Sequence, residues 1–228
     1  MRSSPTARLA PLVLGLLWTA LSGCASWPLS GKSSDTVPGI TPPHQRIDAL
    51  RTLAGEARSK DAAERERIAS ELAAEYPRET DPMIRVAMVR AIAACPGPAS
   101  AAALREAAKD SDADVRIAVC KALGRQKGPE ATAVLREMFA GDVDMDVRLA
   151  AARALGETRD PAAMATLALG LEDRDPAMQY RAVTSLRRIA PQDLGNDAGR
   201  WRQYLQGEPA APTPTPTPSM AERLRRAF

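Results

Sequence analysis

The middle of the chain repeats one segment at a nearly constant interval, and this repeat limits the possible folds more than any other feature. The leading aspartates of the four copies are 31, 32 and 31 residues apart: Asp81, Asp112, Asp144 and Asp175. Prolines between the copies keep the same interval: Pro98, Pro129 and Pro161. A fixed spacing of roughly 20 to 50 residues indicates stacked supersecondary units, none of which can bury its apolar side alone.

Each copy has the pattern of a helix with one apolar stripe. In the second copy, apolar residues recur at three- and four-residue steps: Val115, Ala118, Val119, Ala122 and Leu123. The third copy repeats the stripe: Val147, Ala150, Ala151, Ala154 and Leu155. Asp-Pro steps such as 81–82 and 175–176 supply a helix N-cap followed by a proline, whose missing N–H costs nothing there. We also expect Gly124 and Gly156 to end their helices in the left-handed conformation.

No segment alternates in polarity with a period of two, so no sheet is expected. The predicted fold class is all-α: an α-solenoid of about four to five helix–turn–helix pairs, with a concave and a convex side. The D-x-D-V-R-x-x-A-x-x-A-L-G strings and the P-x-x-x-x-x-L segments before them resemble HEAT repeats of the short bacterial type known from phycobilin lyases. The resemblance covers about residues 81 to 190.

Helices are expected on both sides of the repeats as well. Residues 45–58 and 61–76 carry apolar stripes and are predicted to cap the first repeat. Residues 196–205 bring Trp201 and Tyr204 over the exposed core of the last repeat. The repeat domain is therefore predicted to run from 45 to 206.

The start of the chain has the pattern of an export signal. Two arginines precede an apolar run over residues 9–21, which is too short to span about 30 Å of hydrocarbon. The tetrad LSGC at 21–24 resembles a bacterial lipobox. The resemblance implies cleavage between Gly23 and Cys24, which removes residues 1–23, and a diacylglycerol on the Cys24 sulfur. It also implies a membrane-anchored protein outside the cytoplasm, in the outer membrane where the envelope has two, because no aspartate follows Cys24.

Two segments have the composition of linkers. Residues 24–44 are rich in Ser, Gly, Pro and Thr and are expected to be flexible, and the Pro/Thr-rich residues 207–218 are expected to be an extended spacer. The spacer leads to a short basic amphipathic tail at 219–228, with Met220, Leu224 and Phe228 opposite two arginines. This tail is either a second contact with a membrane or partner, or a disordered end with incidental spacing.

Few residues offer catalytic or metal chemistry. His44 is the only histidine, which argues against a histidine-based triad, a zinc site or the di-iron site of deoxyhypusine hydroxylases, a family with a similar fold. Aspartates at 142, 144 and 146 do not match an EF-hand loop, because Val147 and Arg153 hold its glycine and glutamate positions. We therefore predict no cofactor, no metal and no catalytic residue. Apart from Cys24, the cysteines Cys95 and Cys120 are expected to be buried free thiols.

Charge composition argues against nucleic acid as the partner. Residues 46–206 carry 25 Lys plus Arg and 25 Asp plus Glu, so the repeat domain is neutral. Nucleic-acid binding depends on clustered cations that face phosphates. Aromatic residues, which could stack on bases, form only 4% of the chain.

One series of arginines recurs with the repeat and is the strongest candidate for a site. Arg85, Arg116 and Arg148 each lie four residues after a leading aspartate, and Gln179 holds that position in the fourth copy. The resemblance to HEAT arrays implies that such arginines bind aspartates of the adjoining turn and form a ladder between repeats. The alternative is a basic stripe that faces a protein partner.

Together these features predict a membrane-anchored lipoprotein whose solenoid is a non-enzymatic scaffold for a protein partner in the cell envelope. The repeats provide an extended surface, and the anchor would confine the search for a partner to the membrane plane. Two alternatives stay open at this point. One is an envelope enzyme or small-ligand carrier that uses the concave face, and the other is a purely architectural envelope protein.

Overall fold

A computed structural model describes residues 41–207, and the predicted signal, Cys24 and the C-terminal tail lie outside these residues. Within 41–207 there are ten α-helices and no strand. They are α1 Pro43–Glu56, α2 Ala62–Glu75, α3 Pro82–Ala93, α4 Pro98–Ala107, α5 Ala113–Gln126, α6 Pro129–Gly141, α7 Met145–Thr158, α8 Met164–Leu171, α9 Pro176–Ile189 and α10 Ala198–Leu205. Short 3-10 turns extend α1 and α2 and open α8: Ala57–Ser59, Tyr76–Arg78 and Pro161–Ala163. The predicted all-α solenoid of helical repeats is thus confirmed.

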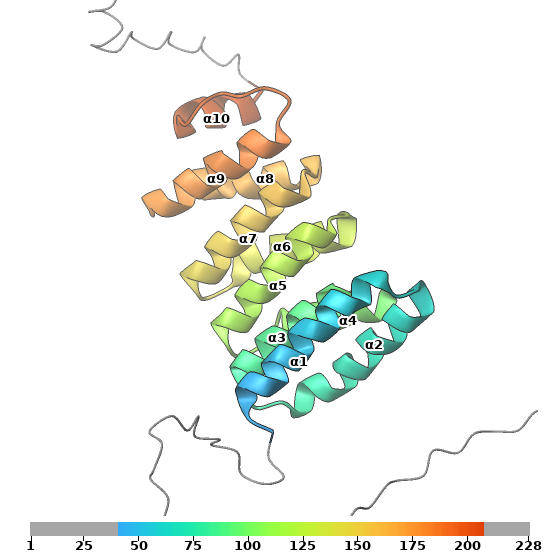
Figure 1. The fold of residues 1–228 in the computed structure, drawn as a ribbon. Helices are drawn as coiled ribbons and strands as arrows, with labels where there is room; N and C mark the ends of the chain where they lie inside the picture. Colours follow the sequence, from blue (N-terminus) through green and yellow to red (C-terminus); the bar gives the residue numbers. More distant parts are fainter. Residues whose placement is uncertain (1–40, 208–228) are drawn as a thin grey trace, which may run out of the picture. The chain divides into compact units, whose positions relative to one another are not determined.

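The helices of residues 41–207 form two layers. The odd-numbered helices α1, α3, α5, α7 and α9 pack side by side in chain order (Figure 1). In the other layer α2 packs on α4 and α6 on α8, and α10 lies at the C-terminal end against α8 and α9. From α3 to α9, each odd helix also contacts the even helix of its own pair, as α5 does with α6. The first predicted capping pair is a full unit of this array, because α1 packs on α3 and α2 packs on α4.

Aspartates begin most of the helices, as the Asp-Pro and Asp-x-Asp patterns predicted. The Asp112 carboxylate accepts hydrogen bonds from the backbone N–H groups of Asp114 and Val115, at 2.9 and 3.2 Å. The same capping bond occurs at the start of the other helices that an aspartate precedes: Asp61, Asp81, Asp144, Asp175 and Asp197. These bonds satisfy backbone donors that have no partner within the helix, so each repeat begins at a defined residue.

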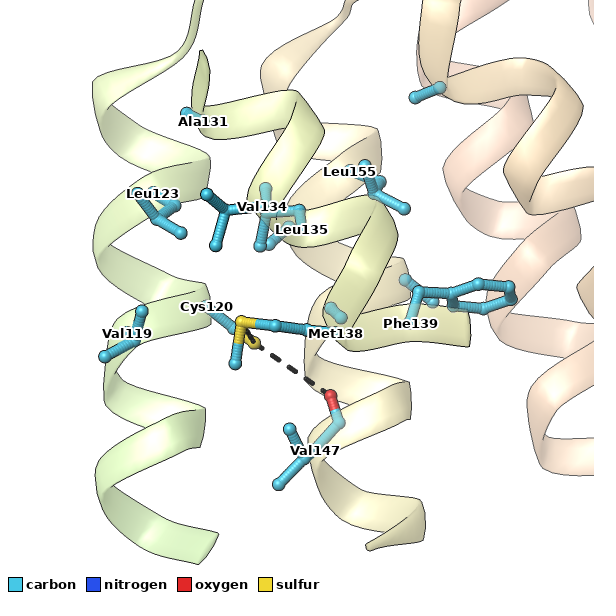
Figure 2. Packing of buried hydrophobic residues seen from close by; sticks show 14 of the residues in the cluster. Val119, Cys120, Leu123, Ala131, Val134, Leu135, Met138, Phe139, Val147 and Leu155 are labelled. Atoms are coloured by element: carbon cyan, nitrogen blue, oxygen red, sulfur yellow. Dashed lines mark hydrogen bonds between the residues drawn. The ribbon is translucent and has the colours of Figure 1, made fainter. Parts of the chain in front are cut away.

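The predicted apolar stripes form the core between the layers. All five stripe residues of α5 are buried, and in α7 only Ala150 is half-exposed. Cys120 of α5 points toward α6, and its sulfur lies 3.7 Å from the sulfur of Met138 (Figure 2). Cys95 and Cys120 are free and buried, as expected, and burial raises the pKa of the Cys120 thiol to about 12.

The prediction that Gly124 and Gly156 end their helices is wrong. Both glycines lie inside a helix, and α5 and α7 continue to Gln126 and Thr158. Their role is close packing: a Cβ atom on Gly124 would lie 3.1 Å from Cα of Ala154, and one on Gly156 would lie 2.8 Å from Cα of Ser185. The absence of a side chain lets α5 approach α7, and α7 approach α9, with backbone nearly touching backbone.

The last helix closes the C-terminal end of the core. Trp201 of α10 is fully buried, and its indole N–H donates to the carbonyl oxygen of Gly195 at 2.9 Å. Its ring meets the ring of Tyr204 edge to face, with centroids 6.0 Å apart. Arg202 ties α10 to α8, because it bonds the Leu171 carbonyl oxygen and lies 2.8 Å from a Glu172 carboxylate oxygen. Trp201 therefore covers the core as expected, and its ring has no face left for a ligand.

The close approach at Gly156 is testable by adding one methyl group. Gly156→Ala is expected to lower the free energy of unfolding by about 1–3 kcal/mol, because α7 and α9 must move apart to admit the methyl. Gly55→Ala is the matched control, since nothing lies within 4 Å of its Cβ position in α1. The control is expected to be neutral or to stabilise by up to about 1 kcal/mol. Urea unfolding followed by circular dichroism measures both, and an unchanged or stabilised Gly156→Ala protein would contradict the packing role.

Candidate interaction surface

Two of the four predicted site residues form ion pairs between neighbouring repeats. The guanidinium of Arg85 in α3 binds the Asp110 carboxylate in two places, with Nε–Oδ2 and Nη2–Oδ1 distances of 2.9 Å each. Arg116 in α5 binds Asp142 in the same way, at 2.8 and 2.9 Å. The third nitrogen of Arg116 donates to the carbonyl oxygens of Asp110 and Ser111, which precede α5. Each arginine thus joins the turn before its own helix to the turn of the next repeat.

These pairs are largely hidden from water. The side chains of Arg116 and Asp142 are 11% and 7% exposed. Burial alone would raise the pKa of Asp142, but the hydrogen bond from Arg116 and one from the backbone of Asp144 reverse that effect and hold the pKa below its usual range. Asp110 behaves alike, because Arg85 and Tyr76 both donate to its carboxylate. The paired, ionised carboxylate is therefore the favoured form in the folded chain.

The ladder begins one unit earlier than the sequence analysis predicted. Arg46 of α1 binds the Glu79 carboxylate, which also accepts the backbone N–H of Asp81 at 2.9 Å. Arg46 lies 39 residues before Arg85, so it falls outside the 31- and 32-residue interval and was missed. The acidic partners do keep the interval, because each lies two residues before a helix N-cap: Glu79, Asp110 and Asp142. Asp173 holds the same position before α9. This second periodic series of acidic residues is the sequence pattern from which the ion pairs could have been predicted.

The other two predicted residues make no bond to the next repeat. Arg148 donates to the carbonyl oxygen of Asp142 at 2.9 Å and contacts the sulfur of Met145, both near the start of its own helix α7. Gln179 likewise donates to the carbonyl oxygen of Asp173 at 2.7 Å. Among the described residues, the ion pairs of this ladder are those of Arg46, Arg85 and Arg116.

A groove of about 1190 Å³ runs over the C-terminal halves of the odd helices, from α1 to α7. Six cationic side chains line it and one acidic side chain does. The cations are Arg58, Arg90, Lys121, Arg125, Lys127 and Arg153, and the acid is Glu157. Small residues make up most of the remaining lining: Ala54, Ala93, Ala94, Gly97, Ala118, Ala122 and Ala154. We call this feature the cationic groove.

Most of its charges lack a partner on the chain. Arg153 lies 2.9 Å from Glu157, and Arg188 of α9 approaches the same carboxylate at 3.8 Å. Within residues 41–207, the other five groove cations have neither an ion pair nor a side-chain hydrogen bond, and all five are exposed. The groove is therefore a concentration of free positive charge on a neutral domain.

Overall neutrality concealed the groove because the charges are separated along each helix. In α5, Asp112 and Asp114 lie at the N-terminus, while Lys121 and Arg125 lie toward the C-terminus. The helix dipole favours this placement at both ends. A sequence signal was present, since Arg90, Lys121 and Arg153 are 31 and 32 residues apart and keep the interval of the repeat.

Residues 41–207 contain neither a candidate metal site nor a candidate membrane-spanning helix. Over 41–207 no cluster of three or more histidine, cysteine, aspartate or glutamate side chains could hold a metal ion. In the acidic stretch at 142–146, Asp142 binds Arg116 and Asp144 caps α7. Over the same residues, no helix is both long and apolar enough to cross a bilayer.

Comparison with known families accounts for this architecture. A family profile of HEAT repeats matches residues 69–150 and 140–198, from α2 to the start of α10. The chain belongs to the HEAT-repeat family. HEAT repeats are helical repeats of the interaction and scaffold type, commonly in contact with other proteins. Among curated proteins, none matches the chain.

The ladder of this HEAT array is expected to contribute to its stability. Arg116→Leu leaves the Asp142 carboxylate buried without its counter-charge, so the free energy of unfolding should fall by about 3–5 kcal/mol. Arg51→Leu is the control, because it breaks an exposed pair with Asp48 and should change stability little. Urea unfolding of both proteins measures the difference. Equal stabilities of the two variants would contradict a structural role for the ladder.

The lowered pKa of Asp142 predicts a pH dependence with a definite sign. Above about pH 5 the carboxylate is ionised in both folded and unfolded chains, and its pairing with Arg116 stabilises the fold in full. As the pH falls through the lowered pKa of the folded state, protonation removes that contribution. The stability difference between the wild type and Asp142→Asn should therefore be constant from pH 7 to about 5 and shrink toward pH 3. A difference that persists undiminished at pH 3 would contradict this assignment.

Proposed function

We propose that this HEAT-repeat protein is a lipoprotein scaffold, anchored outside the cytoplasm, that binds a protein partner across several repeats. The observation that carries the proposal is the cationic groove, which is open and continuous over four odd helices. The groove is lined by guanidinium and ammonium groups and by small residues between them. Such a lining is suited to binding the surface of another protein. A lining of this kind recognises a partner by shape and charge rather than by reacting with it.

The anchor is proposed from the LSGC tetrad at 21–24 and the apolar run before it. Acylation of Cys24 would supply the chains that a stable anchor needs, since one chain alone binds only marginally. Residues following Cys24 would then separate the repeats from the membrane surface, and the lack of an aspartate beside Cys24 favours the outer membrane of a two-membrane envelope. Tethering confines the scaffold and its partner to one plane, which raises their effective concentration.

The scaffold function is testable by affinity purification of the full chain from detergent-solubilised membranes. A partner protein recovered in a fixed ratio to the chain is the expected result, because a groove that spans several repeats contacts an extended surface. A small molecule that co-purifies in its place would favour a ligand carrier instead. Recovery of the chain alone after cross-linking in the intact membrane would contradict the proposal.

The anchor makes a separate prediction. Cys24→Ser is expected to abolish incorporation of labelled palmitate and to shift the protein from the membrane fraction to the soluble fraction, because the acylated sulfur is lost. Ser26→Ala, two residues away, keeps the cysteine and should stay labelled and membrane-bound. Fractionation and labelling of cells that express each variant measure the outcome. A Cys24→Ser protein that still carries palmitate would refute the assignment of Cys24.

A further inference from the structure

We infer that the cationic groove binds an acidic segment of the partner protein, with carboxylates of that segment paired to the row formed by Arg90, Lys121 and Arg153. The inference rests on the proposed scaffold function and specifies the chemistry of the partner. Three properties of the groove support it: its free charge, the spacing of its cations and the small side chains between them.

Free charge is the first. Of the six groove cations, Arg153 has a partner in Glu157, and the remaining five have none within the described residues. The contrast with the ladder is informative, because Arg46, Arg85 and Arg116 at the other end of the same helices are all neutralised. A cluster of unpaired cations favours a negatively charged ligand and repels a positively charged one.

The spacing of the cations suits a polypeptide. Arg90, Lys121 and Arg153 hold the same position in α3, α5 and α7, nine residues after the leading aspartate. Neighbouring packed helices are about 8–10 Å apart. An extended chain advances about 10 Å in three residues, and a helix advances about 10 Å in seven. Acidic residues at either interval would therefore meet successive cations of the row.

The small residues of the lining allow close approach. Ala118, Ala122 and Ala154 lie between the cations and leave no bulky side chain to hold a backbone away. At about 1190 Å³, the groove is larger than the roughly 300–1,000 Å³ typical of small-molecule sites. These dimensions fit an elongated segment better than a compact metabolite.

Single-stranded nucleic acid fits the groove less well. Such ligands are held by aromatic side chains on which the bases stack, and the lining contains no aromatic residue. Exposed aspartates at 114 and 146 lie toward the other end of α5 and α7 and would repel phosphates that extended past the groove. A flat anionic bilayer also fits less well, because the cations surround a hollow rather than a protruding face.

The test uses the full chain in neutral detergent and a fluorescent 16-residue peptide with aspartate at every third position between glycine and serine. We expect saturable binding by fluorescence anisotropy that weakens as salt is added. Lys121→Glu/Arg125→Glu should weaken binding at least about tenfold, because two attractions become repulsions. The matched control Lys109→Glu/Arg174→Glu reverses two exposed cations outside the groove and should leave the affinity unchanged. Circular dichroism verifies that both variants fold.

Several outcomes would overturn the inference. They are an acidic peptide that does not bind, binding that the groove variant leaves intact, and tighter groove-dependent binding of a 16-nucleotide thymidine oligomer or of phosphatidylglycerol vesicles. Failure of the proposed function is distinguishable from these. If the groove variant still captures the wild-type partner from membranes, the scaffold stands and the inference fails, whereas the absence of any partner contradicts the scaffold itself.

Discussion

The structure depends on one constraint: no repeat can bury its apolar stripe except against its neighbours. Val115 and Val119 of α5 and Val147 of α7 are fully buried, and they belong to one core cluster that runs from Val86 of α3 to Trp201 of α10. Glycines at 124 and 156 bring the odd helices so close that an added methyl would meet a neighbouring Cα atom. Stacking in chain order is therefore required for a core to exist, and both ends need a cover, which α1 with α2 and α10 provide.

Stacking also gives the two edges of the odd layer different chemistry. At the edge where these helices begin, carboxylates cap backbone N–H groups and bind the ladder arginines, so the cations of the ladder are neutralised within the protein. At the edge where the helices end, cations accumulate with few acids to meet them. The odd helices all run in the same direction, and the dipole of each favours acidic residues at its N-terminus and cations at its C-terminus. The cations of successive repeats therefore gather on one edge of the layer. A neutral domain thereby carries a cationic groove.

The sequence predicted the elements that arise from local patterns, and it failed where distance in space decided the outcome. Helix starts at the aspartates and the stripe from Val115 to Leu123 followed from capping and periodicity. Gly124 and Gly156 were wrongly predicted to end their helices, because a glycine near the end of a helix commonly terminates it. In the structure both glycines are needed instead for the close approach of the next odd helix. Arg46 was missed because its unit is longer than the others. The groove was missed because a net charge sums residues that the fold separates, although the interval between Arg90, Lys121 and Arg153 carried the information.

The most direct test of the account asks which surface the partner touches in the native membrane. A photo-activatable amino acid at Arg90 or Arg125, in the groove, is compared with one at Arg174, an exposed position between α8 and α9. We predict that irradiation cross-links a partner from the groove positions and not from position 174, and that mass spectrometry of the cross-linked peptide finds a segment rich in aspartate and glutamate. Cross-links that form equally at position 174, or a groove cross-link to a basic segment, would contradict the account.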